Sequence, residues 1–249
     1  MKPIHSAIVV TLAALCAAPA VAQVPAPVAA AVASADRPAA DKENDAARKP
    51  AELLTFAGVK PGDKVADFMP GGGYVTRLFS KVTGDSGKVY AVVPSEIAAR
   101  MPRAVEGARA IAADPKFANV SVAETNPDLA LPEPIDLFWT SQNYHDLYNS
   151  GGPEAGDQLL AGVFKALKPG GVLIITDHAA KPGTSRADAT PLHRIDPALV
   201  KAQATAAGFV LEGESDAIAN PQDPRDKPVF DASIRGKSDH FALKFRKPG

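Results

Sequence analysis

The feature that most constrains the fold is a regular alternation of short apolar runs with helical stretches from residue 64 onward. Strands are expected at 64–69, 87–94, 119–124, 134–140, 171–178, 210–218 and 240–248, and helices at 73–82, 95–115, 156–171 and 196–209. This alternation predicts an α/β fold with a doubly wound, seven-stranded, mostly parallel sheet. The last two strands have no helix between them, so we expect the final strand to run antiparallel.

The N-terminal residues resemble an export signal rather than part of the fold. Lys2 precedes an apolar run over 4–18, and Ala20-Val21-Ala22 forms a small-residue cleavage site. This order predicts a secretory signal peptide over 1–22 and an exported protein, in bacteria a periplasmic one. A membrane anchor is the alternative, but the run is short for a bilayer.

The rest of the chain divides into a leader and one domain. Residues 23–35 are rich in Ala, Pro and Val and predict a flexible leader, and 36–249 form the domain. Cys16 is the only cysteine, so cleavage of the signal leaves no thiol for disulfides, thiolate metal sites or nucleophilic catalysis. This composition suits an oxidising compartment.

The charge balance excludes some partner classes. The formal net charge is -1, which gives no reason to expect nucleic acid or, after signal cleavage, a membrane surface as partner. We therefore expect a small-molecule substrate. The sequence sets no oligomeric state.

A glycine loop follows the first predicted strand. The stretch VADFMPGGGYVT, residues 65–76, places Asp67 near the end of the strand and Gly71, Gly72 and Gly73 before a helix. Ligands in such sheets bind beyond the carboxyl ends of the strands. Glycine lets the backbone approach a ligand, and the N–H groups at a helix N-terminus attract an anion. The alternative is a tight turn that binds nothing.

Several segments together resemble the class I S-adenosylmethionine-dependent methyltransferases. The glycine loop, LKPGGVLIITDH over 167–178 and TAAGFVLEGES over 205–215 are similar to segments of that family, in the same order. With NYHDLY over 143–148 and NPQDPRDKPVFD over 220–231, the chain more narrowly resembles a group of exported bacterial methyltransferase-like proteins. The resemblance implies a Rossmann-like fold, S-adenosyl-L-methionine as cofactor, and methyl transfer to a small-molecule acceptor.

The resemblance also implies roles for individual residues. The loop over 140–148 would face the transferred methyl group, with a histidine that can accept a proton near neutral pH. Alternatively, its Asn and Asp cap a turn while the tyrosine packs. The implied catalytic residues are Tyr144, His145 and Asp146, and the implied cofactor residues are Asp67, Gly71, Gly72, Gly73, Glu96, Glu124 and Asn143.

Two positions depart from the family pattern and keep other functions open. Met69 stands where the family has its first glycine, and Val93 stands where it has the acid that holds the ribose, with Glu96 as the nearest substitute. An exported, non-catalytic protein that binds a small ligand is therefore the alternative to the enzyme.

A third possibility is a metal-assisted hydrolase that uses His145, Asp146, Asp177 and His178. Their spacing matches no ligand motif, so no metal is predicted. The charged stretch over 36–50 and the loop over 221–231 are either solvated surface or covers over the cleft.

Overall fold

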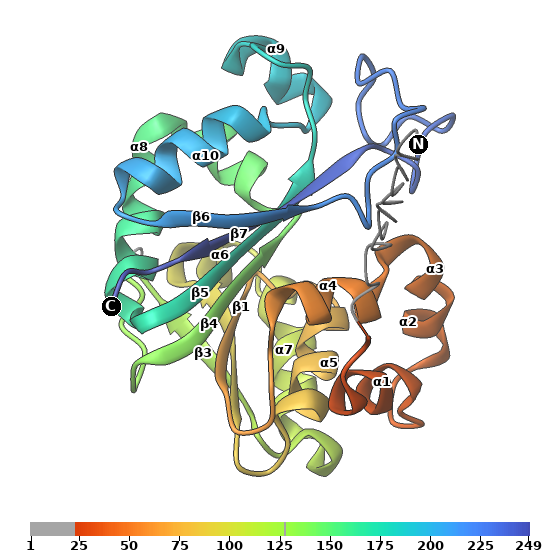
Figure 1. The fold of residues 1–249 in the computed structure, drawn as a ribbon, viewed down its shortest axis with the longest axis vertical. Coiled ribbons are helices and arrows are strands. Elements are labelled where there is room, and N and C mark those ends of the chain that lie inside the picture. The colour runs from red at the N-terminus through yellow and green to blue at the C-terminus, as the bar shows by residue number, and fades with distance from the viewer. Residues whose placement is uncertain (1–22, 127) are drawn as a thin grey trace, which may run out of the picture.

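The computed structural model describes residues 23–126 and 128–249, so the predicted signal peptide lies outside the described residues. The chain builds one seven-stranded sheet in the order β3-β2-β1-β4-β5-β7-β6 (Figure 1). The strands are β1 (Lys64–Phe68), β2 (Lys88–Pro94), β3 (Val120–Thr125), β4 (Ile135–Ser141), β5 (Leu167–His178), β6 (Val210–Ser215) and β7 (His240–Arg246).

The strand directions confirm the predicted architecture. β1 pairs in parallel with β2 and β4, β2 pairs in parallel with β3, and β4 pairs in parallel with β5. Strand β7 runs antiparallel to both of its neighbours, β5 and β6. The order reverses between β1 and β4, and this switch point is where a doubly wound sheet opens a crevice for ligands.

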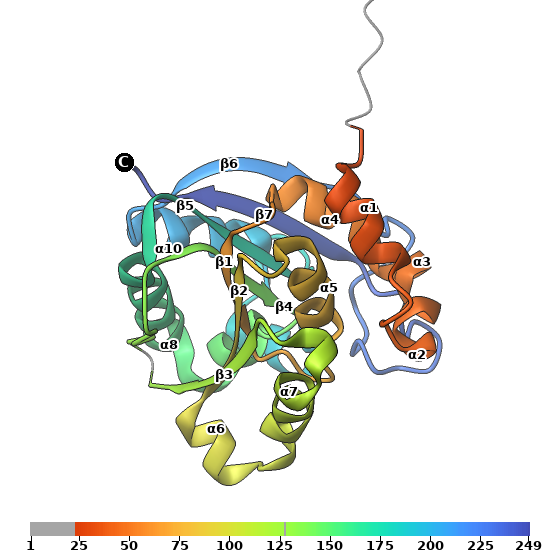
Figure 2. The same ribbon diagram turned by 90° about the horizontal axis from the view of Figure 1, so that it is seen from below.

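Helices cover both faces of the sheet, as Figures 1 and 2 show. One face carries α1, α4, α5 and α7, and the other carries α8 and α10. The bounds are α1 (Ala26–Ala33), α2 (Ala39–Glu43), α3 (Asp45–Arg48), α4 (Pro50–Ala57), α5 (Tyr74–Thr83), α6 (Ser95–Arg100), α7 (Arg103–Ala113), α8 (Tyr144–Ala166), α9 (Arg186–Ala189) and α10 (Pro197–Ala206). No helix in the described part of the chain is both long and apolar enough to cross a membrane.

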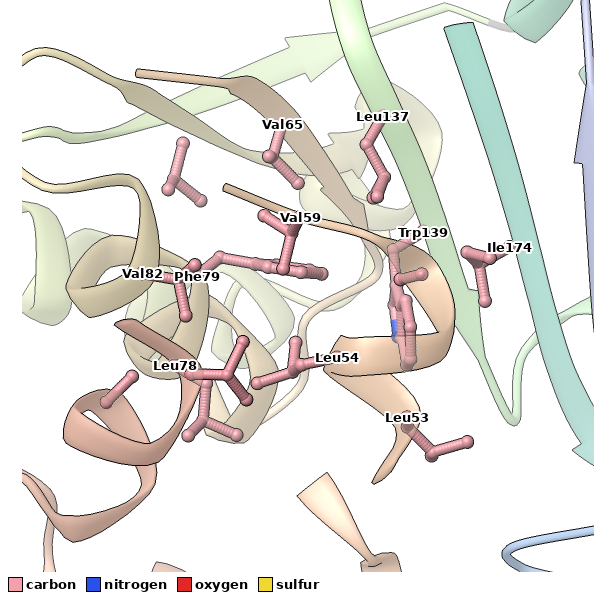
Figure 3. Packing of buried hydrophobic residues seen from close by; sticks show 14 of the residues in the cluster. Leu53, Leu54, Val59, Val65, Leu78, Phe79, Val82, Leu137, Trp139 and Ile174 are labelled. Carbon is pink, nitrogen blue, oxygen red and sulfur yellow. The ribbon is translucent and has the colours of Figure 1, made fainter. Parts of the chain in front are cut away.

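The core on the α5 face is built around the only tryptophan of the chain. The Trp139 ring packs edge-on against Phe79 of α5, with ring centroids 5.6 Å apart. Leu53 and Leu54 of α4 lie beside it (Figure 3). Burial of aromatic and aliphatic area of this kind is the main source of stability in such a layer. It fixes α4 and α5 against the carboxyl half of β4.

The predicted flexible leader over 23–35 is wrong for most of its length. Residues 26–33 form α1, and Val28 and Ala31 are fully buried against the core. Alanine is the strongest helix former, and its small side chain lets α1 approach α5 closely. The uncharged residues that suggested a flexible leader instead form a helix whose apolar side packs against the core.

Before β1 the chain breaks at Lys49, which has φ of +46°, and Pro50 starts α4. Two of the predicted helices also differ from the structure, each for a local reason. The helix predicted over 95–115 divides at Pro102, which cannot continue a helix. Helix α8 begins at Tyr144 rather than near 156, and Gly152 and Pro153 kink it.

Candidate functional site

The glycine loop forms the turn that the resemblance implies, even where its sequence departs. Met69 has φ of +51°, Gly71 of +55° and Gly73 of +77°. The left-handed conformation is costly for residues other than glycine. The Met69 N–H donates to the Val92 carbonyl over 2.8 Å, which ties the loop to β2. Met69 therefore adopts a left-handed backbone at the position where the resemblance implies a glycine.

The loop is packed on one side and open on the other. A Cβ added to Gly73 would lie 2.0 Å from Cδ1 of Ile111, and one added to Gly107 would lie 3.1 Å from the Gly71 carbonyl oxygen. A Cβ on Gly71 or Gly72 would meet no atom within 4 Å. Among the described residues, the N–H groups of Gly71 and Gly72 donate to no protein acceptor. The open side thus offers free donors to a carboxylate, which fits the methionine end of S-adenosylmethionine.

Two of the predicted cofactor residues, Asp67 and Asn143, hold the glycine loop through hydrogen bonds. Asp67 is buried and accepts a hydrogen bond of 2.6 Å from the Thr76 hydroxyl in α5. Burial raises the pKa of Asp67 to about 7, although the bonds from Thr76 oppose this. Asn143 donates to the carbonyls of Phe68 and Met69 over 3.2 and 3.3 Å. Both side chains hold the turn in place.

Among the described residues, no buried acid lies at the end of β2, where the resemblance implies the acid that holds the ribose. Val93 ends the buried run of β2 and is 1% exposed. Glu96 is exposed in the first turn of α6, and Glu124 is exposed and forms an ion pair with Arg109. The glycine loop therefore offers donors for the methionine portion of the cofactor, whereas the end of β2 offers no carboxylate for its ribose hydroxyls.

A cavity of about 460 Å³ opens beside the loop at the carboxyl ends of the strands. Small-molecule sites commonly have this size. Its walls come from α3, α4, the start of α5, the ends of β4 and β5, the start of β7 and the segment over 217–238. Figure 2 shows that segment lying next to α2 and α3. Both stretches that could cover the cleft thus meet over this cavity.

The N-terminal cover is anchored by a polar cluster. Arg37 is buried and donates to both carboxylate oxygens of Asp45, over 2.8 and 2.6 Å. The Tyr74 hydroxyl donates to the same carboxylate over 2.6 Å. The Arg48 guanidinium lies 4.7 Å from the centre of the Tyr74 ring. Asp45 therefore joins α3 to the first residue of α5, at the wall of the cavity.

The three residues implied as catalytic do not line this cavity. Tyr144 is fully buried, and its hydroxyl donates to Gln203 of α10 over 3.0 Å. His145 is 3% exposed, and Asp146 is exposed beside His193. Helix α8 starts at Tyr144 and places Tyr144 against α10, His145 against Asp177 of β5 and Asp146 beside His193, and the catalytic roles implied for these residues stay predictions. Ser141 and Gln142 line the cavity instead.

His145 is held as an ion pair between two carboxylates. Its Nδ1 lies 2.6 Å from Asp177 Oδ1, its backbone N–H donates to Asp177 over 2.8 Å, and its Nε2 lies 3.1 Å from Asp146 Oδ1. Burial lowers the pKa of His145, but Asp177 and Asp146 outweigh this and raise it to about 10. The ring is therefore protonated at neutral pH and is not available as a base.

His193 completes a small cluster with these groups. Its Nδ1 lies 3.1 Å from Asp146 Oδ1, and one ligand atom from each of His145, Asp146 and His193 lies within 4.8 Å of the others. In the described chain, Asp146 joins the two rings as a shared hydrogen-bond acceptor. The prediction that no metal is bound stays a prediction.

His178, which the sequence placed at the carboxyl end of its strand, lies beside His240, a residue that sequence reasoning missed. They face each other across β5 and β7 with ring centroids 4.4 Å apart, and both line the cavity. Burial and the nearby His240 ring lower the pKa of His178 to about 3, and burial also lowers the pKa of His240. Ser238 Oγ lies 3.0 Å from His178 Nδ1, and Gln142 Nε2 lies 3.0 Å from His240 Nε2. Both rings are neutral groups for hydrogen bonding.

Comparison with known proteins places this fold among methyltransferases. No known family model matches the sequence. The chain is 32% identical over 124 residues to a protein described as ubiquinone/menaquinone biosynthesis C-methyltransferase UbiE from Cronobacter sakazakii. That match covers 50% of this chain and 46% of the relative, so less than half of the relative's length is spanned.

Solved structures share the fold over most of the chain. A SAM-dependent methyltransferase from Aquifex aeolicus matches with a TM-score of 0.58 and 18% identity, over 84% of this chain and 98% of that one. Fibrillarin from Aeropyrum pernix, in complex with natively bound S-adenosyl-L-methionine, matches with a TM-score of 0.52 and 15% identity, over 81% and 76%. At these identities the likeness shows the fold alone.

Proposed function

The chain has the fold of the class I S-adenosylmethionine-dependent methyltransferases, and from this premise we propose that it transfers a methyl group from S-adenosylmethionine to a small-molecule acceptor. The observation that carries this proposal is the open side of the glycine loop. Its left-handed turn is kept at Met69, Gly71 and Gly73, and the N–H groups of Gly71 and Gly72 have no protein acceptor in the described chain. Free N–H groups beside a helix N-terminus are the donors that bind an anionic group such as a carboxylate.

Different parts of the site would bind the cofactor and position the acceptor. When bound, S-adenosylmethionine supplies an electrophilic methyl group on a sulfonium sulfur. Gly71 and Gly72 would hold its carboxylate, and Asp67 and Asn143 keep the loop in position. The adjoining cavity would orient the acceptor and exclude water, which is the main demand of an in-line transfer.

The cavity wall, and not His145, would position the attacking group of the acceptor. The neutral ring of His178 can accept a hydrogen bond from an acceptor hydroxyl or amine at Nε2, whereas His240 Nε2 already accepts from the Gln142 side-chain amide. The protonated His145 lies behind Asp177, outside the cavity. We therefore assign His145 to support of the β5 end.

Export is part of this proposal. The motif over 1–22 supports secretion, and the absence of cysteine beyond Cys16 is in keeping with an oxidising compartment. An exported methyltransferase needs S-adenosylmethionine outside the cytoplasm. Fusion of residues 1–22 to a reporter enzyme that is active only after export tests this point, and a reporter that stays cytoplasmic would refute it.

The function is tested by calorimetric titration of the purified protein with S-adenosylmethionine and with S-adenosylhomocysteine. We expect both to bind, more weakly than usual for the fold because the ribose acid is missing at Val93. No heat and no thermal shift at millimolar ligand would refute the proposal. Binding of an unrelated small ligand alone would favour the non-catalytic alternative.

A further inference from the structure

The charged side chains that line the cavity are all cationic. Arg48, Lys49, Arg235 and Lys237 line it, and no Asp or Glu is among its lining residues. In the described part of the chain none of these four side chains forms an ion pair with a carboxylate. The whole chain carries a net charge of -1, so the positive charge is local. A cleft with one sign of charge concentrates ligands of the opposite sign.

The two pairs of cations come from the two covering segments. Arg48 and Lys49 lie at the end of α3 and are half-buried, whereas Arg235 and Lys237 lie in the segment before β7 and are exposed. A single carboxylate on the glycine loop does not require four cations on the far walls of a neighbouring cavity. The charge therefore indicates a second anionic group.

Beneath the cations the cavity is apolar. Leu53, Leu54 and Trp139 form its floor, and Val229 and Phe230 close it from the segment over 217–238. Figure 3 shows Leu53 and Leu54 beside the Trp139 ring. Phe230 is 58% exposed, and its ring packs edge-on against the His193 ring with ring centroids 4.9 Å apart. These walls suit the carbon skeleton of a ligand.

A few polar groups remain inside. His178 and His240 are neutral, and Trp139 Nε1 is buried with no hydrogen-bond partner in the described protein. A buried donor without a partner costs stability unless a ligand or water satisfies it. An apolar wall with a few polar groups that converge on it is the usual form of a small-molecule site.

We propose that the cavity binds an amphipathic organic anion, a carboxylate or sulfonate with an aromatic or aliphatic body, and that this anion is the methyl acceptor. The role as acceptor rests on the proposed function, whereas the preference for an anion does not. In the transfer, a lone pair on the attacking oxygen or nitrogen forms the bond to the methyl carbon. The carbon–sulfur bond breaks with its electron pair left on sulfur, and any proton on the attacking atom passes to water.

The single tryptophan provides a direct test. We would titrate the protein with 4-nitrobenzoate and with its uncharged counterpart 4-nitrobenzamide, and follow quenching of Trp139 fluorescence with calorimetry as a second readout. We expect saturable binding of 4-nitrobenzoate at least tenfold tighter than that of the amide in 20 mM salt. In 500 mM salt the advantage should shrink several-fold because the charges are screened. Equal affinities, or no saturable quenching by either compound, would overturn the proposal.

Charge-removal variants locate the effect. The double variant Arg235→Gln with Lys237→Gln should weaken 4-nitrobenzoate binding at least fivefold and leave the amide unchanged. Arg100 and Lys181 are also exposed and unpaired among the described residues but lie outside the cavity, so Arg100→Gln with Lys181→Gln is the matched control. Equal losses in both double variants would overturn the proposal, since the effect would then be one of net charge.

The cofactor titration separates the two proposals. S-adenosylhomocysteine should bind the Arg235/Lys237 variant as it binds the wild type. If the variant loses S-adenosylhomocysteine and the wild type shows no preference for the anion, the cations serve the cofactor and the inference fails while the function stands. If the anion binds as predicted but S-adenosylhomocysteine never does, the proposed function fails and the anion site remains.

Discussion

Asp67 at the end of β1 accepts a 2.6 Å hydrogen bond from Thr76 Oγ1 in the first turn of α5, and both side chains are buried. The bond joins the two ends of the glycine loop, so the carboxyl is part of the scaffold of the site. Burial raises the pKa of Asp67 from its ordinary 3.8 to about 7. This places its titration within the range in which the protein would work.

The sign of the effect on stability follows from this shift. The folded state binds the proton more tightly than the unfolded state, so Asp67 favours folding most below pH 3.8, and the benefit is lost as the pH rises to about 7. Between pH 5 and pH 8 the loss is about 2–3 kcal/mol. In Asp67→Asn this titration is absent, because the amide keeps an oxygen for Thr76 without a charge.

Urea unfolding at both pH values measures this difference. The free energy of unfolding of Asp67→Asn minus that of wild type should be about 2–3 kcal/mol larger at pH 8 than at pH 5, because only the wild type loses stability as the pH rises. A difference that does not change with pH would mean that Asp67 ionises normally in the folded protein.

The open side of the loop predicts that a side chain at position 71 blocks binding without unfolding the protein. Gly71→Val places its side chain where no protein atom lies within 4 Å, but imposes the strain of φ +55°, about 1–2 kcal/mol. Gly183→Val is the matched control, since Gly183 also has a positive φ of +75°, no protein atom within 4 Å of an added Cβ, and a position outside the glycine loop. Both should melt a few degrees lower, and only Gly71→Val should lose S-adenosylhomocysteine in calorimetry. Normal binding by Gly71→Val would show that the site is misplaced.

The hydrogen bond from the Tyr74 hydroxyl to Asp45 predicts that α2 and α3, which cover the cavity, are held in place by the start of α5. Tyr74→Phe removes one hydrogen bond to a charged acceptor, which is worth about 1.5–3 kcal/mol. Because the loss is local, amide hydrogen exchange over residues 39–48 should accelerate about tenfold or more, while the sheet stays protected. Tyr148→Phe is the control, since the Tyr148 hydroxyl has no hydrogen-bond partner among the described residues. Equal acceleration in both variants would contradict this role for Asp45.

Much of the fold could be predicted because local patterns determine it. Apolar runs buried on both faces marked the parallel strands, and the missing crossover marked the antiparallel end of the sheet. The glycine loop was recognisable because its backbone needs left-handed residues at fixed places. Met69 shows the limit of that signal, since a residue other than glycine adopts the left-handed conformation there.

The cavity could not be predicted in the same way, because it depends on where one helix starts and how two strands align. A start of α8 at Tyr144 turns Tyr144, His145 and Asp146 away from the cavity, and no capping side chain marks that start. His240 did carry a usable signal. The start of an antiparallel strand lies beside the carboxyl ends of its parallel neighbours, so a histidine there belongs to the ligand edge of the sheet.

The central claim, that the glycine loop holds S-adenosylmethionine, is tested most directly by amide hydrogen exchange with and without S-adenosylhomocysteine. The predicted result is protection concentrated at residues 69–76, where the N–H groups of Gly71 and Gly72 gain an acceptor, with a smaller effect at 141–144. Unchanged exchange over 69–76 at a saturating concentration, or protection confined to another part of the chain, would contradict it.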